Sequence, residues 1–144
     1  MRRLTKITEF IDQALIEIEV VGKHVHKGRS LMEFEKESWR IYKGCESAIF
    51  LLKLEMASIE APDDTKINID KDHLEHSLPK ADKYIRDSRN CIDNVRLDEA
   101  LLNLRLARNI MADICTQIKK RNLSEKRRKA KESTVQNFSS QIEP

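Results

Sequence analysis

The sequence predicts an all-α protein, folded as an antiparallel bundle of four main helices. Of its 144 residues only three are glycine and three are proline, about a third of the usual share. Strand-rich sandwiches and barrels need many turn residues, so this composition excludes them. Apolar residues recur instead at spacings of three and four, the repeat of one helical face.

The first helix is expected from about Thr5 to Val21. Its apolar residues are spaced three and four apart, at Leu4, Ile7, Ile11, Ala14, Ile18 and Val21, which places them on one face. Gly22 and Gly28 then bracket a stretch that contains His24 and His26. Glycines in such positions are typical of a turn between two helices.

A second helix is expected to begin at Ser30, which forms a capping-box pattern with Glu33. It should end near Ala61, because Pro62 disfavours helical backbone in the residue before it. Its inward positions are Ser38, Tyr42, Cys45, Ile49, Leu52, Met56 and Ile59. Residues 48–54 are apolar on nearly every side, so this helix is expected to be central or to face a second subunit.

A long break is expected from Pro62 to Asp72, followed by a short helical turn between Lys71 and Ser77. Pro79 suits the first position of a third helix, which should run to about Asn94. Its inward positions are Ala81, Ile85, Ser88 and Ile92.

The fourth helix is expected to start at Asp98, a good N-cap residue, and to end near Arg121. Its main apolar face contains Leu97, Leu101, Leu104, Met111, Ile114, Cys115 and Ile118. A second stripe contains Leu102, Leu106 and Ile110. Two apolar faces pack against two layers, so we expect self-association through the second and fourth helices.

Positive charge is concentrated in the C-terminal part of the chain. The net charge is +3, yet residues 119–144 carry +5 and the rest of the chain carries −2. We therefore expect a helical bundle domain over residues 1–122 and a basic, then polar, flexible tail over residues 123–144. Ser124 is expected to cap a short helix over 126–132, and the polar residues from 133 onward are expected to be disordered.

The basic tail suggests a contact with nucleic acid. The candidate residues are Lys126, Arg127, Arg128, Lys129 and Lys131, because such clusters neutralise phosphates without reading sequence. No aromatic residue is interleaved with them before Phe138, so base-specific recognition is not expected. A tail that only aids solubility is the alternative, and the segment lacks the apolar face that membrane insertion needs.

Arg108 is the most unusual residue of the fourth helix. Its position places it between Leu101 and Cys115, on the apolar side. An arginine there must reach the rim, or it must pair with a buried carboxylate or a bound anion. The candidate partners are Asp87, Glu46 and Glu55.

His73 and His76, preceded by the acidic residues of 70–72, form the one clustered set of metal-ligand types. A metal site needs three or four convergent ligands, so we expect a solvated segment and no metal. The chain also lacks the Glu-x-x-His motifs of di-iron bundles. His24 and His26 lie among basic residues that repel a cation.

No catalytic or cofactor-binding residue is expected. The chain has no nucleophile elbow and no phosphate-binding glycine loop. Its three cysteines, Cys45, Cys91 and Cys115, are widely spaced, which is typical of reduced thiols in the cytoplasm. Neither a secretory signal nor a membrane-spanning segment is expected, so we expect a cytoplasmic protein without a cofactor.

One stretch resembles a known family. Its residues are Ala81-x-x-Tyr84-Ile85-x-Asp87-Ser88, Leu97-Asp98-Glu99-Ala100-Leu101 and Leu104-x-x-Ala107. This stretch, about Ala81 to Ile114, resembles an archaeal helical-hairpin domain family of unknown function. The resemblance implies that a tyrosine and an aspartate on the first helix of a hairpin face an alanine-rich second helix. It implies no activity.

These observations favour a non-enzymatic interaction or assembly module that forms a homo-oligomer and uses its basic tail to contact nucleic acid. The alternative is a bundle enzyme, or a binder of a metal or small ligand, with its site between helices. Arg108 or the pair His73 and His76 would carry that alternative site.

Overall fold

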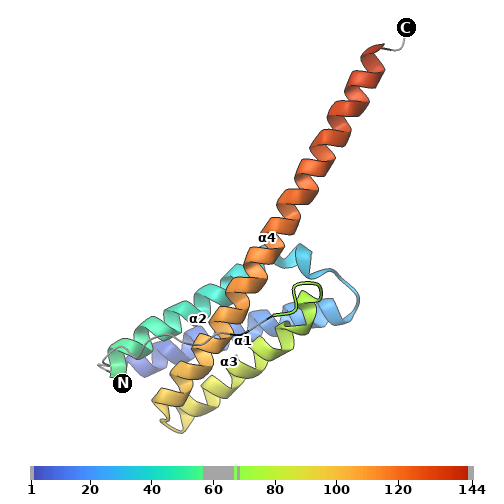
Figure 1. Cartoon of the computed structure of the whole chain (residues 1–144). Coiled ribbons are helices and arrows are strands. Elements are labelled where there is room, and N and C mark those ends of the chain that lie inside the picture. Colours follow the sequence, from blue (N-terminus) through green and yellow to red (C-terminus); the bar gives the residue numbers. More distant parts are fainter. Residues whose placement is uncertain (1, 57–66, 68, 143–144) are drawn as a thin grey trace.

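A computed structural model describes the backbone of residues 2–56, 67 and 69–142, and the side chains of residues 3–56, 67 and 69–133. Over these residues the chain forms the helices α1 (Arg2–His26), η1 (Leu31–Phe34), α2 (Glu35–Met56), η2 (Leu74–His76), α3 (Leu78–Asp93) and α4 (Leu97–Ile142), and no strand. The all-α fold class is therefore confirmed (Figure 1). None of the described helices is sufficiently long and apolar to cross a membrane.

The four α-helices form a bundle in which each packs against two neighbours, in the cyclic order α1, α2, α4, α3. Neighbouring helices run in opposite directions (Figure 1). An ion pair of 3.4 Å, for example, joins Arg3 at the start of α1 to Glu55 at the end of α2. Because α2 and α3 lie diagonally and run the same way, α3 begins at the end of the bundle opposite to the end of α2.

The predicted inward faces form the core. The largest fully buried side chains are Ile7, Ile11, Ile18, Ile41, Leu52, Leu74, Ile85, Leu104, Ile110, Met111, Ile114 and Ile118. Each contributes about 1.5–3 kcal/mol of transfer free energy relative to an exposed position. Ile110, assigned to a second apolar stripe, belongs to this core, whereas Leu102 of the same stripe is exposed.

The helix α2 occupies a corner of the bundle and is not its central helix. Ile49 and Leu52 are buried, but Phe50 and Leu54 point outward and are 62% and 47% exposed. The prediction that this helix faces a second subunit therefore stays a prediction. The predicted helix end near Ala61 and the inward position Ile59 lie outside the described residues.

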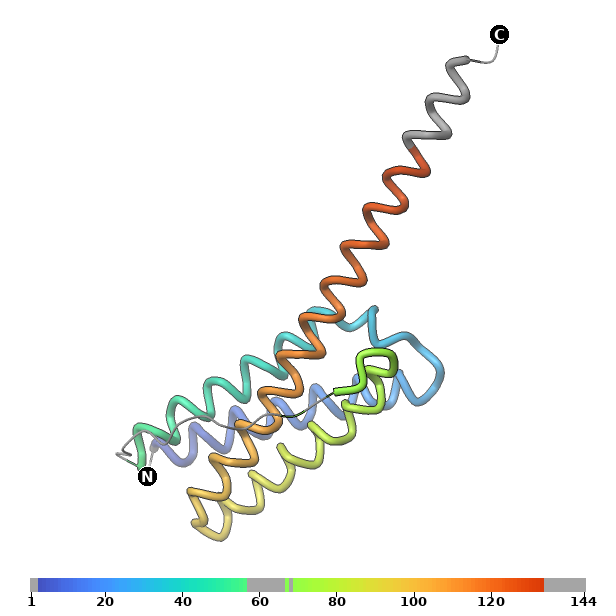
Figure 2. The backbone as a smooth tube through the Cα atoms, viewed as in Figure 1, coloured from blue at the N-terminus to red at the C-terminus, as the bar shows by residue number. Residues whose placement is uncertain are grey.

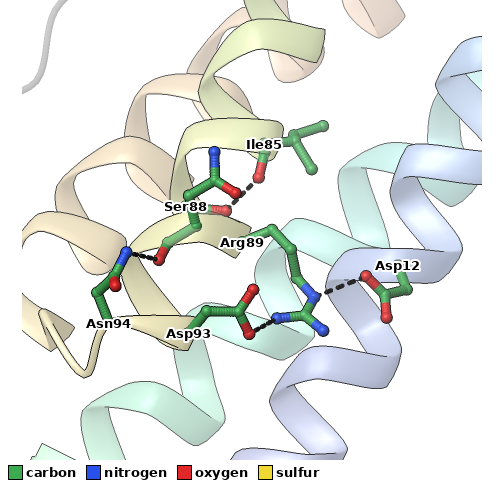
Figure 3. A network of polar contacts seen from close by, with 7 residues as sticks. Asp12, Ile85, Ser88, Arg89, Asp93 and Asn94 are labelled. Carbon is green, nitrogen blue, oxygen red and sulfur yellow. Dashed lines mark hydrogen bonds and ion pairs between the residues drawn. The ribbon is translucent and has the colours of Figure 1, made fainter.

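The α1–α3 pair is bridged by Arg89 of α3 (Figure 3). Its Nε donates to Asp12 of α1 at 2.9 Å, and its guanidinium also pairs with Asp93, one turn further along α3. In the same helix the buried hydroxyl of Ser88 donates to the carbonyl of Ile85 at 2.6 Å. The partly buried arginine thus ties the end of α3 to the middle of α1.

The helix α1 is longer than predicted, since it ends at His26 and is capped at Gly28, not at Gly22. Gly28 has a φ of +97°, and its N–H donates to the Val25 carbonyl at 3.0 Å while the next N–H, of Arg29, donates to the His24 carbonyl at 3.1 Å. This is a Schellman motif. His24 and His26 therefore lie in the last helical turns, and the turn predicted there is wrong.

The helix α2 is preceded by a 3₁₀ turn that starts at the predicted cap, Ser30. The Ser30 Oγ accepts from the Met32 N–H at 3.2 Å. The Glu33 carboxylate, expected to complete the capping box, pairs with the guanidinium of Arg29 at 3.4 Å. The N-cap at Ser30 is therefore confirmed, and the glutamate of the predicted capping box is paired with Arg29.

The helix α3 starts one residue before the predicted Pro79 and ends in a second Schellman motif. Here the left-handed position is Val95, with a φ of 55°. The Arg96 N–H donates to the Cys91 carbonyl at 2.8 Å and the Val95 N–H to the Ile92 carbonyl at 3.0 Å. A β-branched residue in this conformation is strained by roughly 1–2 kcal/mol.

The helix α4 runs from Leu97 to Ile142 (Figure 1), and it extends well beyond the bundle (Figure 2). Four predictions are therefore wrong over the described residues: the start at Asp98, the end near Arg121, a separate helix over 126–132 and disorder over 133–142. Asn and Ser disfavour a helix interior by only roughly 0.5 kcal/mol each, and extending an existing helix needs no new nucleus. The division of the chain after residue 122 stays a prediction.

Two substitutions test the helix ends. We expect Val95→Gly to raise the free energy of unfolding by about 1 kcal/mol, because glycine adopts a positive φ without strain. Gly28→Ala should lower it by about 1–2 kcal/mol for the converse reason. Urea unfolding followed by circular dichroism measures both. Stabilisation of the chain by Gly28→Ala, or destabilisation by Val95→Gly, would contradict the two assigned motifs.

Candidate functional site

The projecting part of α4 displays the predicted basic residues to solvent. The side chains of residues 123–133 are all exposed. Arg128 pairs with Glu125 and, at 3.7 Å, with Glu132, and its hydrogen bond lowers the pKa of Glu125. Lys126, Arg127, Lys129 and Lys131 form no ion pair within the described part of the chain.

The base of this projecting helix is held by two other segments. The Arg121 guanidinium donates to the Lys71 carbonyl, in the loop before η2. The Asn122 amide donates to the Met32 carbonyl of η1 at 3.3 Å. The point where α4 leaves the bundle is therefore adjacent to the loop that carries His73 and His76.

That loop contains two successive turns, each closed by a backbone hydrogen bond between residues three apart. The His73 N–H donates to the Asp70 carbonyl at 3.2 Å, and the His76 N–H donates to the His73 carbonyl at 3.0 Å. Only the second of these turns belongs to the 3₁₀ helix η2, because the His73 backbone between them is not helical (φ −133°, ψ 66°). Asp70, His73 and His76 thus stand at the ends of two successive turns, while Leu74 between the histidines is fully buried.

The side chains of Asp70, His73 and His76 lie close together. His73 Nδ1 is 3.1 Å from Asp70 Oδ2, and the His73 and His76 rings stack with centroids 5.1 Å apart. One ligand atom from each residue lies within 4.8 Å of the other two, and all three residues are exposed. The hydrogen bond from His73 lowers the pKa of Asp70. The sequence identified both histidines, but it did not show that they converge with Asp70.

Arg108 lies on the α2 side of α4, with a side chain 15% exposed. Its guanidinium pairs with Glu46 at 3.2 Å, and its Nε donates to Asn109 Oδ1 at 3.0 Å. The other two candidate partners, Asp87 and Glu55, pair with Lys83 and Arg3 respectively.

Sequence reasoning missed a second arginine, Arg105, which is only 8% exposed. Its Nε is buried and has no hydrogen-bond partner among the described residues. The sequence does contain a signal for its burial. Arg105 follows the buried Leu101 by four residues, and residues four apart share a helical face.

The buried thiols are poor nucleophiles. Burial, and secondly the nearby Glu46, raise the pKa of Cys45 to about 12. Burial likewise raises the pKa of Cys115 to about 12. Both groups therefore stay protonated near neutral pH, whereas thiolate is the reactive form.

Two shallow hollows lie on the outer surface of α1 and α2. The first, of about 260 Å³, has Phe10, Arg40 and Gly44 in its lining. The second, of about 450 Å³, is lined in part by Phe10 and Phe50. Neither hollow is lined by Arg108, His73 or His76, although Glu46, the partner of Arg108, lines the second.

Comparison of the chain with protein-family models, curated proteins and solved structures finds no match. The resemblance of residues 81–114 to the archaeal helical-hairpin family therefore stays a prediction.

The raised pKa values predict slow alkylation of two cysteines. At pH 8, iodoacetamide should modify Cys45 and Cys115 at least about a hundredfold more slowly in the folded chain than in urea, because few thiolates are present and both groups are buried. Peptide mass spectrometry after timed quenching measures each site. Labelling of either cysteine at the unfolded rate would show that it is a reactive thiol.

Proposed function

We propose that the protein is a non-enzymatic helical-bundle interaction module that contacts nucleic acid through the projecting part of α4. The observation that supports this most directly is that α4 carries its basic residues past the bundle on one continuous helix. A cytoplasmic location is part of the proposal, and it is supported by three cysteines that form no disulfide.

The geometry of the basic residues suits phosphate neutralisation. Residues 123–142 extend over about 30 Å, at 1.5 Å per residue. The four consecutive residues 126–129 are all basic, and steps of about 100° distribute their side chains around the whole helix. A charge on every face favours sequence-independent binding to a phosphate backbone over the reading of bases from one face.

A charge-neutral variant tests this interaction. We expect replacement of Lys126, Arg127, Arg128, Lys129 and Lys131 by Gln to weaken binding to duplex DNA or RNA at least about tenfold near 50 mM salt. The dependence of log affinity on log salt should also become shallower, by about one for each phosphate that the variant no longer neutralises. Fluorescence anisotropy across a salt series measures both quantities, and Gln retains helix propensity.

The matched control removes five positive charges from the bundle. Five of its exposed lysines are replaced by Gln in this variant, namely Lys6, Lys23, Lys36, Lys80 and Lys83. This variant has the same net charge as the first, so net charge alone predicts an equal decrease in affinity. Binding that falls equally in both variants, or in neither, would refute an interaction through α4.

Self-association is the second part of the proposal, with a second copy of the chain as the partner. Three large apolar side chains on the neighbouring helices α2 and α4 support it, because Phe50, Leu54 and Leu102 are 62%, 47% and 49% exposed. Exposed apolar surface of this kind is typical of protein interfaces.

The oligomeric state tests this second part. We expect the unmodified chain to be oligomeric at micromolar concentration, and Phe50→Glu with Leu54→Glu to shift it to monomer, because two charges would then be desolvated in the interface. The control is Ile16→Glu with Val20→Glu, an equally spaced exposed pair on α1. Light scattering gives the mass. A monomeric unmodified chain, or equal dissociation by the α1 pair, would contradict an interface on α2.

A further inference from the structure

The loop before α3 holds one carboxylate and two imidazoles within the space of a single ligand sphere. The 3.1 Å between His73 Nδ1 and Asp70 Oδ2 is close to the separation of about 3.0–3.4 Å between two ligand atoms that lie about 2.0–2.1 Å from one ion. We propose that Asp70, His73 and His76 bind a divalent transition-metal ion of the zinc class.

The donor set selects the class of metal. Two imidazole nitrogens and one carboxylate oxygen suit zinc and its first-row neighbours, whereas Mg²⁺ and Ca²⁺ prefer oxygen ligands alone. Three protein ligands leave at least one coordination position for water or another donor. The exposure of all three residues gives an ion direct access from solvent.

The loop backbone places the ligands before any ion binds. The hydrogen bonds of two successive turns fix the backbone from position 70 to position 76, and the fully buried Leu74 anchors the second turn in the core. The Asp70 Oδ1 also accepts from the Asp72 N–H at 3.0 Å, which orients its carboxylate. Arg121 holds the Lys71 carbonyl from the side of α4. Little of the loop therefore needs to be ordered when the metal binds.

Charge in the same loop is consistent with a cation. Asp72 and Glu75 lie between the three ligands in the sequence, and their negative charges offset the positive charges of Lys71 and Arg121. The other two histidines provide a contrast. His24 and His26 are two residues apart on α1 and so point to different faces, and His24 stacks on Phe34 beside Arg29.

Metal titration of the full chain, produced without an affinity tag and stripped with a chelator, tests the site. Calorimetry with zinc chloride should show one ion bound per chain. His73→Ala, His76→Ala and Asp70→Asn should each weaken binding at least about tenfold. All three positions are exposed, so the variants should fold, and far-UV circular dichroism verifies this.

The matched control is the double variant His24→Ala with His26→Ala, which should bind zinc as the unmodified chain does. No saturable binding, or unchanged binding in either single histidine variant, would overturn the site. Unchanged affinity in Asp70→Asn would overturn the three-ligand set, and an equally weakened control would show binding elsewhere. The titration contains no nucleic acid, so its outcome is independent of the function proposed for α4.

Discussion

The packing of α4 between α2 and α3 is the interaction on which the rest of the structure depends. Ala107, Met111, Ile114 and Ile118 of α4 have no solvent exposure, which fixes the rotation of the helix about its axis. Because α4 is one helix, this rotation also sets the directions in which the described side chains beyond the bundle, up to residue 133, point. The roughly seven turns held in the core provide the nucleus from which the projecting turns extend. The basic residues are thus presented on an ordered helix that the bundle supports.

The core could be predicted from the sequence, but the helix ends could not. The free energy gained by burial is a sum over many apolar side chains. A spacing of three and four therefore identifies the inward faces even if single positions such as Ile110 are misassigned. A helix end instead depends on differences of about 1 kcal/mol. The helix α1 continues through Gly22 and is capped at Gly28, the glycine with a positive φ, and α4 continues through Asn122, whose amide donates to a carbonyl of η1. The second of these interactions joins segments far apart in the chain, which local patterns do not report.

The difference between local patterns and contacts across the fold also explains which features of the candidate sites could be predicted from the sequence. Helical spacing placed Arg108 on the apolar side, but α4 packs against both helices that carry the candidates Glu46, Glu55 and Asp87. Only the position at which α4 packs along α2 selects Glu46. The spacing of Asp70, His73 and His76 is visible in the sequence, but its meaning depends on the backbone. In an α-helix two steps of three residues rotate a side chain by about 120° from its starting direction. The loop instead consists of two successive turns, joined at His73, whose backbone is not helical.

The separation of charge along the chain connects the two parts of the proposed function. Residues before Lys119 carry a net charge of −2 and those from Lys119 onward carry +5, so a polyanion is attracted to the projecting helix and weakly repelled by the bundle. The exposed apolar residues Phe50 and Leu54 lie on the bundle itself, which leaves both surfaces accessible together. An assembly joined through the bundles would hold two projecting helices, and a second contact within one assembly forms at a high effective concentration. Weak, sequence-independent contacts from single helices would then add up to stable binding without any base-specific recognition.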